Sequence, residues 1–171
     1  LTASWSAKEG MDCHLILEER VKGSYKPGAS GNNFLFELLG VKSIGVVEAG
    51  SDMMAQMIKK AKALNAEGKK PYIIPGGASN DIGALGYALC SEETMTQLND
   101  MRLNIDHIVL PSGSAGTHAG LVAGMKGVNG GIPVYGINVS RTKDVQEELV
   151  FSLAQKTIEK LEIENAVKRE D

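Results

Sequence analysis

The amino-acid sequence predicts an α/β fold made of doubly wound parallel sheets with helices on both faces. Short apolar segments rich in Val, Ile and Leu alternate with longer segments of helical periodicity, in the order βαβαβ. Gly-rich turns join two of these apolar segments to the helix that follows. The chain has 171 residues, which corresponds to one domain or slightly more and suffices to bury about 70% of the unfolded surface.

The apolar segments predict short buried strands, because each is β-rich in composition and too short for a stable helix. The predicted strands comprise residues 13–17, 43–47, 72–74, 105–110 and 134–139. Since predicted helices separate consecutive strands, the strands are expected to pair in parallel.

The segments between the strands have helical patterns and start signals. Asn32 and Asn33 are expected to cap a helix over residues 34–39, and Ser51 is expected to cap a helix that extends to residue 66. Helical pattern is also present in residues 1–10, 81–99, 115–126 and 143–168.

The turn after the predicted strand 105–110 has the composition of an anion cradle. Small residues let the backbone approach a ligand, and the first N–H groups of the following helix lie at its positive end. We expect a phosphate group to bind the backbone and hydroxyl groups of this turn, namely Gly113, Ser114, Ala115, Gly116 and Thr117. The alternative is a turn whose glycines only allow tight helix packing.

A second Gly-rich turn, residues 75–80, precedes the predicted helix 81–99. In a parallel sheet all strand-to-helix turns open at the same edge, so Gly77, Ala78 and Ser79 are expected to approach the first turn. The alternative is a turn that merely caps a helix through Ser79 or Asn80.

Other ligand-binding motifs fit the sequence less well. The glycines lack dinucleotide spacing, Asn138 stands where an acidic ribose ligand is expected, and the turn has no P-loop lysine. The sequence of residues 112–116 is similar to G-x-S-x-G, the nucleophile-elbow motif of serine hydrolases. In that fold, however, the catalytic His must follow the Ser nucleophile and the acidic residue in the sequence. Of the three histidines, His118 lies on the helix that Ser114 itself would open, which disfavours a hydrolase.

The composition of the chain argues against several classes of binding partner, namely nucleic acids, membranes and metal ions. The net charge of −3 and the lack of a basic cluster argue against nucleic acid, and no apolar run is long enough for a membrane span. Cys13 and Cys90 lie far apart and without metal-ligand spacing, so free thiols and no metal site are expected. A cytoplasmic protein is the default expectation.

Four segments together resemble one enzyme family: S-G-S-A-G-T-H-A-G at residues 112–120, G-A-L-G-Y ending at Tyr87, Gly31-Asn32, and V-S-R ending at Arg141. They are similar to the D-cysteine desulfhydrase and ACC deaminase family of pyridoxal-phosphate enzymes, of the tryptophan synthase β type (fold type II). ACC deaminases have V-T-G-S-T-Q at the phosphate loop, so the resemblance favours the desulfhydrase branch.

The resemblance implies roles for individual residues. Gly113, Ser114, Ala115, Gly116 and Thr117 would bind the phosphate of pyridoxal phosphate. Gly77 and Ala78 would line the substrate side.

The resemblance also implies that the chain is an interior fragment, with residues 1–66 from the smaller, substrate-side domain and 67–171 from the larger cofactor domain. The Schiff-base lysine of the family, in G-G-N-K, is expected before Leu1, so no catalytic residue is assigned in this chain.

The implied function is a lyase that converts D-cysteine to pyruvate, ammonia and hydrogen sulfide, with this chain inactive alone. The alternative from a different class is a non-catalytic remnant that binds a phosphorylated small molecule; ACC deaminase or hydrolase activity ranks lower. A small amino acid is the expected substrate. A homodimer or a self-associating fragment is expected, because uncovered strand edges favour association.

Overall fold

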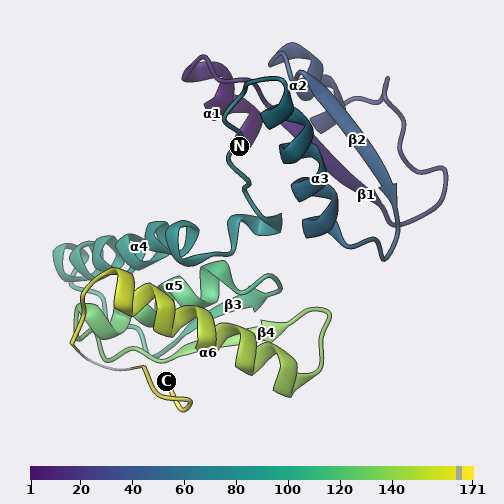
Figure 1. Ribbon diagram of the computed structural model, residues 1–171. Coiled ribbons are helices and arrows are strands. Elements are labelled where there is room, and N and C mark those ends of the chain that lie inside the picture. The colour runs from purple at the N-terminus through teal and green to yellow at the C-terminus, as the bar shows by residue number, and fades with distance from the viewer. Residues whose placement is uncertain (165–166) are drawn as a thin grey trace. The chain divides into compact units, whose positions relative to one another are not determined.

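The structure of the chain is a computed structural model that describes residues 1–164 and 167–171. These residues form two compact units, Leu1–Ile73 and Ile74–Asp171 (Figure 1). Each unit contains two parallel strands joined through a helix. The prediction of an α/β fold with parallel strands is confirmed.

The first unit contains α1 (Thr2–Lys8), β1 (His14–Glu19), α2 (Asn32–Leu38), β2 (Ser43–Glu48) and α3 (Met53–Ala66). Strands β1 and β2 pair in parallel, with His14 opposite Ser43 and Glu19 opposite Glu48. Helix α3 packs against β1.

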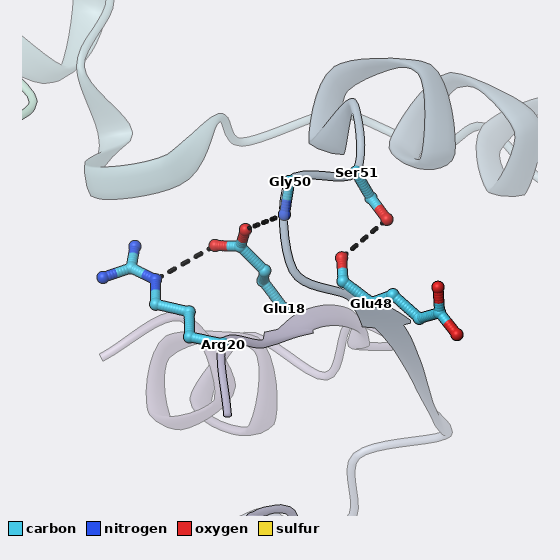
Figure 2. A network of polar contacts seen from close by, with 5 residues as sticks. All are labelled: Glu18, Arg20, Glu48, Gly50 and Ser51. Atoms are coloured by element: carbon cyan, nitrogen blue, oxygen red, sulfur yellow. Dashed lines mark hydrogen bonds and ion pairs between the residues drawn. The ribbon is translucent and has the colours of Figure 1, made fainter. Parts of the chain in front are cut away.

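The turn between β2 and α3 is tied to the end of β1 by the polar contacts in Figure 2. The Glu18 carboxylate accepts hydrogen bonds from the Gly50 N–H at 2.9 Å and from Arg20 Nε at 3.0 Å. The Gly50 N–H, and after it Arg20, hold the pKa of Glu18 below its ordinary value. The Ser51 hydroxyl donates to the Glu48 carbonyl at 2.7 Å.

Ser51 therefore does not cap α3, and the prediction of that cap is wrong. The N-cap is Asp52, whose carboxylate accepts from the Ala55 N–H at 2.9 Å. Ser and Asp are both common N-cap residues. Asp52 caps the helix here because the Ser51 hydroxyl is already bonded to the Glu48 carbonyl at the end of β2.

The second unit contains the short 3₁₀ turn η1 (Gly76–Ala78), α4 (Asp81–Met101), β3 (Ile108–Ser112), α5 (Gly116–Gly127), β4 (Val134–Asn138) and α6 (Lys143–Lys160). Strands β3 and β4 pair in parallel, with Ile108 opposite Val134 and Ser112 opposite Asn138. Helix α5 packs against both α4 and α6 (Figure 1). Its buried residues Ala119, Val122 and Ala123 belong to the hydrophobic core of this unit.

Helices α4 and α5 approach each other closely along a row of glycines in α5. A Cβ atom on Gly124 would lie 2.5 Å from the Ala88 carbonyl oxygen, and one on Gly120 would lie 2.6 Å from Tyr87 Cβ. Both distances are shorter than the contacts of real Cβ atoms, so these two positions have room for glycine but not for a larger residue. The glycines of this helix thus allow α4 and α5 to pack tightly.

Two predicted elements differ in the structure. Residues 72–74 are not a strand: Tyr72 is 68% exposed, and no strand among the described residues pairs with this segment. Helix α6 ends at Lys160, because Glu162 adopts the left-handed conformation (φ 56°) and the Ile163 N–H bonds back to the Ile158 carbonyl. Residues 165–166 of the longer predicted helix lie outside the described residues.

The boundary between the two compact units falls after Ile73, whereas the assignment of residues 1–66 and 67–171 to two domains of the enzyme stays a prediction. Lys69 belongs to the first unit: its N–H bonds to the Leu64 carbonyl at 3.0 Å, and its ammonium pairs with Asp12. Among the described helices none is both long and apolar enough to cross a membrane.

Candidate functional site

The candidate site is the turn between β3 and α5, residues 113–117, here called the anion loop. Ala115 is the N-cap of α5 and has a left-handed backbone (φ 75°), which is strained for a residue with a Cβ atom. The N–H groups of Ser114, Ala115 and Thr117 have no hydrogen-bond acceptor among the described residues. Three free donors at the positive end of a helix form a site that suits an anion.

The fourth amide of the loop already has a protein partner. The Gly116 N–H donates to Ser79 Oγ at 3.1 Å, and Ser79 Oγ lies 2.8 Å from Ser114 Oγ. A Cβ on Gly116 would lie 2.7 Å from the same hydroxyl oxygen. Ser79 therefore fills the space beside Gly116 and connects the second Gly-rich turn to the anion loop.

The structure brings the second turn to the anion loop, as predicted, but not for the predicted reason: residues 72–74 do not form a strand of the sheet, and the turn lies there because α4, which follows it, packs against α5. Gly77 has a left-handed backbone (φ 71°), and a Cβ on it would lie 2.9 Å from Ser114 Cβ. Ala78 is also left-handed (φ 50°) and exposed. The same turn caps α4, because Asn80 Oδ1 accepts from the Gly83 N–H at 2.7 Å. Capping and proximity to the loop, which the sequence left as alternatives, are both present.

Three polar side chains next to the loop contact one another: Ser112 and Gln146, which are buried, and His118, which is half-buried. Ser112 Oγ is 2.8 Å from Gln146 Nε2 and 3.1 Å from His118 Nδ1. Ser112 is 1% exposed and Gln146 is 4% exposed. Burial lowers the pKa of His118, against a smaller opposing effect from a hydrogen bond with the Val134 backbone. The Nδ1 atom of a neutral imidazole can accept a hydrogen bond from the Ser112 hydroxyl, whose oxygen in turn accepts a hydrogen bond from Gln146 Nε2.

The segment between β4 and α6 supplies the other contacts to the loop. Asn138 Oδ1 accepts from the N–H groups of Ser140 at 3.2 Å and Arg141 at 3.1 Å, which folds the chain back after β4. The Arg141 guanidinium donates to the Gly113 carbonyl and, at 3.3 Å, to Gln146 Oε1. Gln146 Nε2 also donates to the Gly113 carbonyl at 3.1 Å.

Sequence reasoning missed the roles of Arg141 and Gln146, since neither residue forms a motif with the loop 28 to 33 positions earlier. For Asn138 the sequence indicated only that this position lacks an acidic ribose ligand. An Asx turn at the end of a predicted strand was the available local signal for its role.

The Ser114 hydroxyl has no histidine partner in the described part of the chain. Its hydrogen-bond partner is the Ser79 hydroxyl, whereas His118 bonds to Ser112, which is buried. A serine nucleophile needs a general base at its hydroxyl, and this arrangement does not supply one to Ser114.

Comparison with known proteins identifies relatives of this chain. Residues 1–169 match the family described as pyridoxal-phosphate dependent enzyme. The chain is 36% identical over 157 residues to a D-cysteine desulfhydrase of Yersinia pestis (strain Pestoides F), covering 90% of this chain and 46% of that protein. It is 35% identical over 164 residues to a D-cysteine desulfhydrase of Klebsiella pneumoniae subsp. pneumoniae, covering 95% of this chain and 49% of that protein.

A solved structure described as a crystal structure of an ACC deaminase homologue is also similar. It has a TM-score of 0.77 and 29% sequence identity, and the match covers 96% of this chain and 49% of that one. The chain thus spans about half the length of the relatives that it matches.

Proposed function

This chain belongs to the family of pyridoxal-phosphate dependent enzymes, and we propose that it is part of a lyase of the D-cysteine desulfhydrase kind whose cofactor phosphate binds the anion loop. The observation that carries this proposal is the set of free N–H groups on Ser114, Ala115 and Thr117 at the start of α5. A phosphate dianion offers oxygen acceptors to several such donors at once. The identity of 35% to 36% with D-cysteine desulfhydrases supports the choice of reaction class.

The residues of the loop fit a phosphate group in their chemistry. The exposed Ser114 hydroxyl adds a donor beside the backbone N–H groups. The cradle contains no carboxylate that would repel the anion. The pyridine ring of the bound cofactor supplies an electron sink for carbanion chemistry at the substrate Cα.

In this proposal the residues of the chain bind and orient. The free N–H groups of the loop hold the phosphate, and the N-terminal end of the α5 dipole favours its negative charge by about 0.3–1 kcal/mol. Gly77 and Ala78, on the turn that contacts Ser114, would line the substrate side. The proposed substrate is a small amino acid with a thiol leaving group, and a thiol pKa of about 8.5 makes β-elimination feasible.

No lysine of this sequence lies in a G-G-N-K context, so we expect the 171-residue chain by itself to release no hydrogen sulfide from D-cysteine. The assignment of the first unit to the substrate side, self-association and a cytoplasmic location stay predictions. The non-catalytic alternative shares the same loop, because the free N–H groups would bind any small phosphorylated molecule.

The proposal is tested by titrating the isotope-labelled chain with pyridoxine 5′-phosphate, which has no aldehyde and so does not react with surface lysines. We expect the amide resonances of Ser114, Ala115 and Thr117 to shift with this compound and not with pyridoxine. Equal affinity for inorganic phosphate and for pyridoxine 5′-phosphate would favour the non-catalytic alternative. Unchanged loop resonances would contradict the phosphate site itself.

The hydroxyl contribution is tested by the double variant Ser114→Ala/Thr117→Ala. A hydroxyl hydrogen bond contributes at least about 0.5–1.5 kcal/mol, the value for a neutral acceptor, so the loss of two should cost at least about 1–3 kcal/mol and affinity should fall by at least about one to two powers of ten. The matched control is Ser24→Ala/Thr96→Ala, which makes the same changes at exposed positions that are not part of the loop. An equal affinity in both double variants would show that the loop hydroxyls do not contact the phosphate.

A further inference from the structure

The carbonyl oxygen of Gly113 accepts hydrogen bonds from two side chains that lie outside the anion loop. Gln146 Nε2 donates to it at 3.1 Å, and the Arg141 guanidinium donates to it as well. Both donors come from the segment that follows β4, so neither is part of the loop that they contact.

The direction of this carbonyl determines the direction of the next N–H group. The peptide between Gly113 and Ser114 is trans, and in a trans peptide the C=O and N–H bonds point in opposite directions. Since the Gly113 carbonyl points at Gln146 and Arg141, the Ser114 N–H points away from them. That N–H is one of the free donors of the loop.

Gly113 would not hold this orientation without help, because glycine rotates more freely than any other residue. A flipped peptide would turn a carbonyl dipole toward the anion in place of the N–H, and attraction would become repulsion. A hydrogen-bonding partner for the carbonyl therefore matters more at this position than at an ordinary loop residue.

Gln146 is well placed for this task. It lies in the first turn of α6, its N–H bonds to the Thr142 carbonyl at 3.1 Å, and its side chain is buried. Its two amide hydrogens reach Ser112 Oγ and the Gly113 carbonyl, and its oxygen accepts from Arg141. A buried side-chain amide with all of these bonds made is held rigidly, since leaving any one unmade is unfavourable.

We propose that Gln146, supported by Arg141, is a positioning residue that orients the Gly113–Ser114 peptide so that the Ser114 N–H faces the bound phosphate. This inference rests on the proposed phosphate site. Neither side chain needs to touch the phosphate, because each acts through the carbonyl that it holds.

The test compares Gln146→Met, which keeps the length of the side chain and removes its donors, with the control Gln97→Met. Gln97 is exposed on α4 and bonds only to Glu93 within the described residues. Residual dipolar couplings of the backbone amides measure the orientation of the Ser114 N–H relative to the amides of α5. Titration with inorganic phosphate measures affinity.

In Gln146→Met we expect the Ser114 coupling to leave its wild-type value while the couplings within α5 stay, and we expect the dissociation constant for phosphate to rise about tenfold. Tenfold corresponds to about 1.4 kcal/mol. Gln97→Met should change neither quantity. If Gln146→Met does not fold, Arg141→Met removes the second donor from an exposed position and is measured in the same way.

An unchanged Ser114 coupling in both Gln146→Met and Arg141→Met would overturn the positioning role. A changed coupling with unchanged phosphate affinity would also overturn it, because the orientation would then not matter for binding. If the wild-type chain binds no phosphate, the proposed function fails, and the dipolar coupling still decides whether Gln146 orients the peptide.

Discussion

The close approach of α4 and α5 predicts opposite effects for the same substitution at two glycines. A Cβ on Gly124 would lie 2.5 Å from the Ala88 carbonyl oxygen, 2.6 Å from Ser91 Oγ and 2.7 Å from Ala88 Cα. Ordinary contact begins at 3.4 Å, so the shortest of these distances is 0.9 Å too small. Two of the three neighbours are backbone atoms of a helix, which cannot rotate away as a side chain can.

The magnitude follows from two opposing effects. Overpacking of a close-packed core destabilises by about 1–3 kcal/mol, and contacts with backbone atoms place Gly124→Ala near the upper value. Replacing a helical glycine by alanine stabilises the helix by about 1 kcal/mol. The net expectation is a decrease of about 2 kcal/mol in the free energy of unfolding. The Ser91 hydroxyl, which bonds to the Leu121 carbonyl at 3.1 Å, would be displaced as well.

The matched control is Gly86→Ala in α4, where a Cβ would meet nothing within 4 Å in the described structure. That variant gains helix propensity without overpacking and should be more stable than wild type by up to about 1 kcal/mol. Urea denaturation followed by circular dichroism measures both. Equal stabilities of Gly124→Ala and Gly86→Ala would show that α4 and α5 do not lie as close as described.

Three further substitutions or titrations have definite expected outcomes. Asp52→Ala removes the cap of α3 and should lower the free energy of unfolding in urea by about 0.5–2 kcal/mol, whereas the same change at Ser51 should have a smaller effect. Arg102→Gly relieves a left-handed residue (φ 53°) at the end of α4 and should raise thermal stability by about 0.5–1 kcal/mol; a lower melting temperature would contradict this. Burial lowers the pKa of His118 below 6.5, so the unfolded chain binds more protons and stability should decrease as the pH falls below that value. An NMR titration of the His118 ring with a midpoint at or above 6.5 would refute this.

The sequence by itself determined most of the elements of the fold. Alternating apolar and helical segments predicted the four strands β1 to β4 and the helices between them, because burial of one face imposes its periodicity on the chain locally. The strand, turn and helix at the anion loop were predicted for the same reason, because an apolar strand followed by a Gly/Ser/Thr turn and a helix is a local pattern; anion binding there stays a prediction. The approach of Gly77 to Ser114 was predicted from parallel topology, but residues 72–74 do not form the strand that this reasoning required, and the contact depends on the packing of α4 against α5.

Tertiary structure decided what depends on partners distant in sequence. Residues 72–74 have strand composition, yet a strand exists only where a neighbour completes its hydrogen bonds, and the described structure places none beside them. Ser79 reaches Gly116 across 37 positions, and Gln146 reaches Gly113 across 33. The sequence does not show which group a polar side chain will bond to, because a hydrogen bond depends on the distance and angle between the two groups in the folded chain. The donors of the loop were therefore predictable from its residues, whereas the contacts that orient them were settled only by folding.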